Sequence, residues 1–154
     1  MLVYVLAWIA LFIWASLIDL KNFILPDWIT LPLVVSGVVF NTFSENQFCS
    51  GIDSLLGVVI GYGLIRIVDE LYFKFRKLRG IGQGDAKLLA AIGSILGWQA
   101  LFPILCFAAI LGVVAGLLLI RFKRLTFEQR IPFGPFLSLF ACAFILEKVV
   151  PFAI

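Results

Sequence analysis

The sequence predicts an all-α integral membrane protein, a polytopic bundle of about six transmembrane helices in a single domain, residues 1–154. Hydrophobic residues make up 63% of the chain and charged residues 14%, whereas a soluble domain carries about 25% charged residues. Uncharged apolar runs of spanning length recur along the chain. The basic residues gather in alternate connectors between these runs. The net charge of +3 is small, and we expect a lipid bilayer and no nucleic acid as a partner.

The expected helices follow from the apolar runs and the polar or glycine-rich turns between them. Asp27 is predicted as the N-cap of the second helix, with Trp28 as an interfacial anchor. The fourth run is short, about 13 residues or ~20 Å, so we expect a thinned or water-accessible bilayer beside it. The predicted helices cover Leu2–Ile18, Asp27–Phe43, Ser54–Phe73, Asp85–Gly97, Ala100–Ile120 and a segment from the Pro132–Pro135 turn to about Leu146.

The distribution of basic residues predicts the orientation of the bundle. Connectors after the first, third and fifth runs are basic, and those after the second and fourth hold no Lys or Arg. The positive-inside rule then places the odd connectors in the cytoplasm and both termini outside, in the periplasm. The basic residues of the odd connectors are Lys21, Lys74, Arg76, Lys77, Arg79, Lys87, Arg121, Lys123, Arg124 and Arg130.

Residue types that are rare in the chain exclude several classes of site. Histidine is absent, so neither His-based catalysis nor a His metal site can be formed. The three cysteines, Cys49, Cys106 and Cys142, are widely spaced without a CxxC, and we expect buried thiols rather than disulfides or a zinc site. We expect no metal and no other cofactor. The first run has no basic leader before it and no A-x-A-like exit, which favours a retained anchor over a cleaved signal peptide.

The strongest sign of a functional site is the stretch Gly80–Leu89. Glycines at 80, 82 and 84 precede Asp85, and Lys87 follows it. Alternate glycines allow unusual backbone dihedrals and close approach of a second segment. An acid at a helix start is favoured in its ionised form by the helix dipole. Because a carboxylate at the membrane edge is costly, Asp85 is a candidate functional residue.

Asp19 ends the first apolar run and is the natural partner for Asp85. In the predicted topology both carboxylates lie at the cytoplasmic ends of their helices, so we expect the first and fourth helices to be neighbours. Two carboxylates held close together share one proton. The ionised one can deprotonate a water, and the protonated one can donate to the peptide carbonyl oxygen and the leaving amine.

Structural readings of the same residues stay open. Asp19 could end its helix beside Lys21, and Asp85 could cap its helix and pair with Lys87. A phosphate-binding loop is disfavoured, because no strand precedes the glycines and Asp85 would repel a phosphate. Three GxxxG spacings, Gly57/Gly61, Gly93/Gly97 and Gly112/Gly116, are candidate helix-packing seams.

Several motifs resemble those of one family. Gly82–Leu88 resembles the GxGDxKL form of the GxGD signature of intramembrane aspartyl proteases, as found in type IV prepilin peptidases. Ile18–Pro32, with its Leu-Pro-Asp, resembles the first-aspartate segment of the bacterial enzymes. The segment Leu88–Gly93 and the Gly97–Trp98 pair continue the second motif, and Pro132–Pro135 resembles the FGP element before the last helix. The matches occur in the same order over almost the whole chain.

The resemblance implies an aspartic endopeptidase with Asp19 and Asp85 as the catalytic pair, and Asp27 as the runner-up for the first aspartate. Gly82 and Gly84 would shape the loop, and Lys87 would be a motif residue without an assigned role. The implied partners are prepilin or pseudopilin substrates of type IV pili and type II secretion assemblies. The basic leader of these substrates would be cut after a Gly at the cytoplasmic face of the bacterial inner membrane.

The chain departs from the family pattern in two respects, and two other classes of function stay open. The chain starts at the protease core and has no CxxC, so we expect N-methyltransferase activity to be absent. Leu78-Arg79 stand where many relatives have a Glu. A non-catalytic or substrate-less paralogue acting as a membrane scaffold would leave the two aspartates unexplained. A small proton or cation transporter would predict inverted repeats and carboxylates near the midplane, and no such repeat is visible.

Overall fold

The structure is a computed structural model that describes residues 1–22, 25–76, 82–122 and 132–150. Within these ranges the chain is all-helical, with six α-helices and one short 3-10 turn, η1. Gly80 and the basic residues Lys77, Arg79, Lys123, Arg124 and Arg130 lie outside the described residues. The elements are α1 (Leu2–Asn22), α2 (Asp27–Phe43), α3 (Gly51–Arg76), α4 (Gln83–Leu96), η1 (Trp98–Ala100), α5 (Leu101–Arg121) and α6 (Gly134–Val149).

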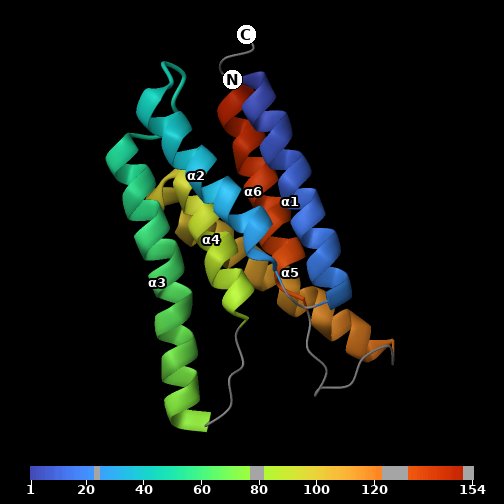
Figure 1. The fold of residues 1–154 in the computed structure, drawn as a ribbon. Coiled ribbons are helices and arrows are strands. Elements are labelled where there is room, and N and C mark those ends of the chain that lie inside the picture. The colour runs from blue at the N-terminus through green and yellow to red at the C-terminus, as the bar shows by residue number, and fades with distance from the viewer. Residues whose placement is uncertain (23–24, 77–81, 123–131, 151–154) are drawn as a thin grey trace.

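The helices form one bundle with α4 at its centre (Figure 1). The α4 helix packs chiefly against α3 and α2 and also contacts α6. We expected α1 to pack against α4, but its main packing partner is α6. The ends of α1, α3 and α5 and the starts of α2, α4 and α6 point toward one end of the bundle, and the start of α1 and the end of α6 lie at the other (Figure 1).

The central place of α4 gives a different reason for its short length. Its residues from Leu88 to Leu96 are all buried inside the bundle. A helix that is apolar on every side is typical of a core position. Because its neighbours cover it, α4 does not have to match the thickness of a bilayer by itself.

Glycine allows α3 and α4 to pack backbone against backbone. A Cβ added at Gly57 would overlap the carbonyl of Gly93, and one added at Gly93 would overlap that of Gly57. One turn along α3, a Cβ at Gly61 would lie 2.7 Å from the Leu89 carbonyl oxygen. Two of the predicted seams thus meet each other. At Gly112 the nearest atoms to an added Cβ are ring carbons 3.6 Å away, an ordinary contact.

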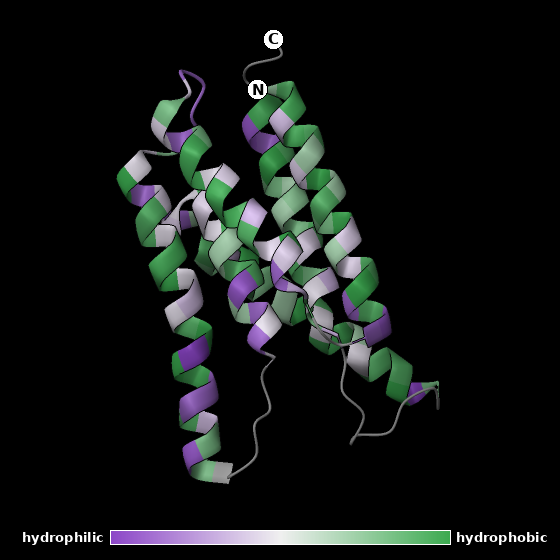
Figure 2. Cartoon of the chain, viewed as in Figure 1, coloured by the Kyte–Doolittle hydropathy of each residue, from purple (hydrophilic) through white to green (hydrophobic). Residues whose placement is uncertain are grey.

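Three helical segments of the described chain are long and apolar enough to cross a membrane, judged by length and composition. They are Leu2–Asn22, Gly51–Phe75 and Trp98–Arg121. The α2 helix is a shorter apolar helix. Apolar residues dominate the helices, and hydrophilic residues gather on the C-terminal half of α3 and near helix ends (Figure 2).

The predicted N-cap of α2 is wrong by one residue, and α4 begins two residues before its predicted start at Asp85. The α2 helix has its N-cap at Pro26, so Asp27 is the first helical residue, with no capping hydrogen bond from a side chain at the N-cap. The α4 helix has its N-cap at Gly82, and Asp85 lies in its first turn. An acid in the first turn still interacts favourably with the helix dipole.

Candidate active site

Asp19 lies in the last turn of α1, where the sequence had suggested the start of a connector. It is one of the few buried carboxylates, with 6% of its surface exposed. Its Oδ2 accepts a hydrogen bond from the backbone N–H of Gly134 at 3.0 Å. Because Gly134 starts α6, the end of α1 is joined directly to the start of α6.

Asp85 lies in the first turn of α4 and is half-buried. Its backbone N–H donates to the Gly82 carbonyl oxygen at 3.1 Å. A Cβ at Gly82 would lie 3.1 Å from Asp85 Oδ2, so the absence of a side chain there leaves room for the carboxylate. At Gly84 a Cβ would lie 2.8 Å from the Leu25 Cβ. Gly84 therefore lets the start of α4 approach the segment that leads into α2.

The two aspartates lie at the same end of the bundle, Asp19 at the end of α1 and Asp85 at the start of α4 (Figure 1). The α6 helix links these two helices by packing against both of them. Like charges brought together in a partly desolvated site disfavour double ionisation, so such a pair holds one proton between them. This arrangement can supply one base and one acid.

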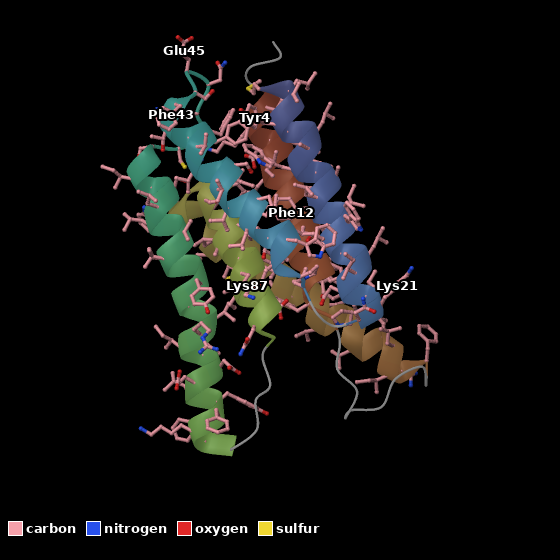
Figure 3. The ribbon with its side chains drawn as sticks, viewed as in Figure 1. Tyr4, Phe12, Lys21, Phe43, Glu45 and Lys87 are labelled. Carbon is pink, nitrogen blue, oxygen red and sulfur yellow. The ribbon has the colours of Figure 1, made fainter. Side chains whose placement is uncertain are left out.

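Asp27 and Lys87 form an ion pair with each other. The pair joins the first turn of α2 to the first turn of α4, and both side chains are partly exposed, 59% for Asp27 and 33% for Lys87. The Lys87 side chain lies at the end of the bundle toward which Lys21 also points (Figure 3). The paired and exposed state of Asp27 supports Asp19 as the partner of Asp85.

Gly134 is the residue near the pair that the sequence did not single out as a site residue. The signal was present, because Gly134 stands within Phe133-Gly134-Pro135, a segment noted only as the lead into the last helix. The contact with Asp19 spans 115 residues and uses a backbone N–H. A backbone donor leaves no trace in the side-chain pattern.

The cysteines are free thiols, and they are partly buried, which is less burial than we expected. Burial and the nearby Asp53 carboxylate raise the pKa of the Cys49 thiol, in the α2–α3 connector, to about 11. Since the thiolate is the nucleophilic form, Cys49 is inert near neutral pH. Among the described residues, no cluster of three or more Cys, Asp or Glu side chains could hold a metal ion.

Comparison with known proteins gives a consistent result. The chain is 40% identical over 123 residues to a prepilin leader peptidase/N-methyltransferase of Burkholderia pseudomallei (strain K96243), covering 80% of this chain and 39% of that protein. It is 39% identical over 127 residues to the prepilin leader peptidase/N-methyltransferase of Aeromonas hydrophila, covering 80% and 42%. The protein of the same name from Pseudomonas aeruginosa is 36% identical over 124 residues, covering 80% and 42%.

The chain therefore spans about two-fifths of the length of the curated relatives that it matches. No solved structure gives a significant match. The family comparison matches residues 5–117 to the type IV leader peptidase family, a range that includes both candidate aspartates and the glycine loop. The chain belongs to the type IV leader peptidase family.

Proposed function

We propose that this chain is the peptidase core of a prepilin leader peptidase that uses Asp19 and Asp85 as its catalytic pair. The observation that carries the proposal is the placement of these two carboxylates at one end of the bundle, at the end of α1 and the start of α4, in a family member (Figure 1). Gly82 leaves room for the Asp85 carboxylate, and Gly84 lets the start of α4 approach Leu25. Asp27 and Lys87 help to hold the start of α4 against α2.

The pair would hydrolyse a peptide bond without a covalent intermediate. The ionised aspartate takes a proton from a water molecule, and the resulting hydroxide attacks the peptide carbonyl carbon. The protonated aspartate donates its proton to the carbonyl oxygen, which gives a diol intermediate. As the C–N bond breaks, the aspartate that took the proton from water passes it to the amine, and a diol O–H returns its proton to the other aspartate. Neither a metal nor a nucleophilic side chain is needed in this scheme.

The proposed location is the bacterial inner membrane, as a multi-pass protein with the active site on the cytoplasmic side. Three segments have the length and composition of membrane spans, and α4 is covered by its neighbours. Two basic residues assigned to the odd connectors, Lys21 and Lys87, lie toward the end of the bundle that holds the aspartates (Figure 3). This distribution supports a cytoplasmic face for that end.

The proposed substrates are prepilins or pseudopilins of a type IV pilus or type II secretion assembly. Their basic leader would be removed after a Gly at the edge of the hydrophobic segment. The peptidase step is the part that we assign to this chain, which matches about two-fifths of the length of relatives named prepilin leader peptidase/N-methyltransferase.

The proposal is tested by co-expression of this chain with a tagged prepilin. The substrate is followed by gel shift, and the mass of its new N-terminus is determined. We expect the wild type to release the leader, and the double variant Asp19→Asn/Asp85→Asn to leave the prepilin intact at equal membrane levels. If the wild type cleaves none of several prepilins, a scaffold or substrate-less paralogue becomes the better account.

A further inference from the structure

The start of α6 lies against the Asp19 carboxylate. The Gly134 N–H donates to Asp19 Oδ2 at 3.0 Å, and both residues are buried. Within the described residues, no other hydrogen bond to the Asp19 carboxylate is present. A backbone donor from a different helix therefore helps to orient this carboxylate.

This contact also completes the N-terminus of α6. The first N–H groups of a helix have no partner inside the helix, and the N-cap residue, Phe133, provides no side-chain hydrogen bond. Asp19 supplies the missing acceptor from α1. The following residue, Pro135, has no N–H, so Gly134 is the donor available at this edge of the helix. The helix dipole adds to the attraction for a carboxylate.

The lack of a side chain at Gly134 is a geometric requirement of the contact. A Cβ there would lie 2.6 Å from Asp19 Oδ2, 3.1 Å from its Cγ and 3.4 Å from its Cβ. The first separation is too short for a real contact, and the second is unusually tight. An alanine at 134 would therefore displace the carboxylate while it keeps the backbone N–H.

We propose that Gly134 is a positioning residue of the candidate active site, which fixes the Asp19 carboxylate in the orientation that serves the pair with Asp85. The inference rests on the proposed function. Gly134 acts through Asp19, so its replacement changes the rate of the chemical step more than substrate binding. A purely structural cap would instead alter the amount of folded protein and leave the activity of each folded molecule unchanged.

The test compares Gly134→Ala with Gly63→Ala, a matched control at which an added Cβ meets no atom within 4 Å. Both purified variants are assayed on a prepilin, and the active fraction is normalised to folded protein. We expect kcat of Gly134→Ala to fall by roughly 100-fold, because a misplacement of about 1 Å can cost that much, with KM within about twofold of the wild type. Gly63→Ala keeps the wild-type kcat.

A second measurement does not depend on activity. Removing the carboxylate in Asp19→Ala leaves space for a Cβ at position 134. We therefore expect Gly134→Ala to lower the thermal unfolding midpoint in the wild-type background and to have little effect in the Asp19→Ala background. If Gly134→Ala accumulates poorly alone, the double variant should accumulate as well as Asp19→Ala.

The outcomes separate the two proposals. Full kcat in Gly134→Ala, with Asp19→Asn inactive, overturns the positioning role and leaves the proposed function in place. An equal loss of stability in both backgrounds, or failure of both the single and the double variant to accumulate, also overturns it. Activity that survives Asp19→Asn and Asp85→Asn contradicts the proposed catalytic pair itself, while the stability comparison still reports on the contact.

Discussion

The ion pair between Lys87 and Asp27 connects the start of α4 to α2, but both side chains are partly exposed. Exposed pairs of this kind contribute about 0–1 kcal/mol because solvent screens them. We expect Lys87→Met to lower the free energy of unfolding by no more than about 1 kcal/mol and to reduce activity modestly. The charge-reversed double variant Asp27→Lys/Lys87→Asp should recover most of the loss. A total loss of cleavage in Lys87→Met at normal protein levels would instead give Lys87 a direct role in the reaction.

Asn41 makes a buried polar contact of a different kind. Its Nδ2 donates to the carbonyl oxygens of Ser94 and Ile95 at the end of α4, at 2.9 and 2.8 Å. Its Oδ1 accepts from the N–H groups of Phe48, at 2.9 Å, and Cys49, at 3.3 Å. One side chain thus serves four backbone groups and fixes the end of α4 against the α2–α3 connector.

Loss of the Asn41 side chain should be costly, because buried polar groups that lose a partner cost about 1–3 kcal/mol each. We expect Asn41→Leu to destabilise the fold by about 3 kcal/mol or more, measured by thermal unfolding in detergent. The exposed Asn46, in the same connector, provides the control, and Asn46→Leu should change stability by less than about 0.5 kcal/mol. Similar unfolding curves for the two variants would mean that Asn41 does not hold α4.

The contact between α3 and α4 depends on two facing glycines, Gly57 and Gly93. Gly57→Ala would force the backbones apart, and overpacking of this kind typically costs about 1–3 kcal/mol. Gly63→Ala, on the same helix but facing open space, should be neutral or stabilising by up to about 1 kcal/mol, since alanine favours the helix. The two variants differ only in where the same methyl group points, so equal unfolding midpoints would argue against the close packing of α3 on α4.

At this scale the sequence was informative about helix identity and less so about helix contacts. The apolar runs and the Gly and Pro turns predicted all six helices, because their periodicity and breakers are local properties. The partner of α1 was not predictable, since hydrophobic runs in a membrane protein do not record which faces meet. The apolar composition of α4 on every side is consistent with a buried position. The sequence could not show this position, because membrane-spanning helices have the same composition.

In the candidate site, too, the sequence showed some of the residues but not how they contact one another. Asp19 and Asp85 stand out because carboxylates are rare beside apolar runs. The glycines before Asp85 can be recognised directly in the sequence. The contribution of Gly134 is a backbone N–H offered across 115 residues, which only the folded chain brings together. The N-cap predicted at Asp27 and the helix start predicted at Asp85 both lie too late in the chain. The N-cap is Pro26 in α2 and Gly82 in α4.

For the molecule as a whole, the proposed topology puts the ends of α1 and α3 in the cytoplasm and the α2–α3 connector outside. Glu45, in that connector, and Lys21, at the end of α1, are exposed and lie at opposite ends of the bundle (Figure 3). They can therefore report on the two sides after the native cysteines are replaced by alanine. We expect a membrane-impermeant maleimide to label Glu45→Cys in intact spheroplasts and Lys21→Cys only after lysis. The reverse pattern would invert the topology.

The central claim is that Asp19 and Asp85 act as one catalytic pair, and single replacements test it most directly. Asn preserves the size and polarity of Asp but cannot ionise. Each of the variants Asp19→Asn and Asp85→Asn is purified and incubated with a prepilin. We expect kcat to fall by at least about 1,000-fold in each, which is within the range for general acid–base catalysis. Asp27→Asn, the exposed runner-up, should retain most of the wild-type rate. Leader release by Asp19→Asn or Asp85→Asn at near wild-type rate would contradict the pair, and loss in Asp27→Asn together with an active Asp19→Asn would move the first aspartate to position 27.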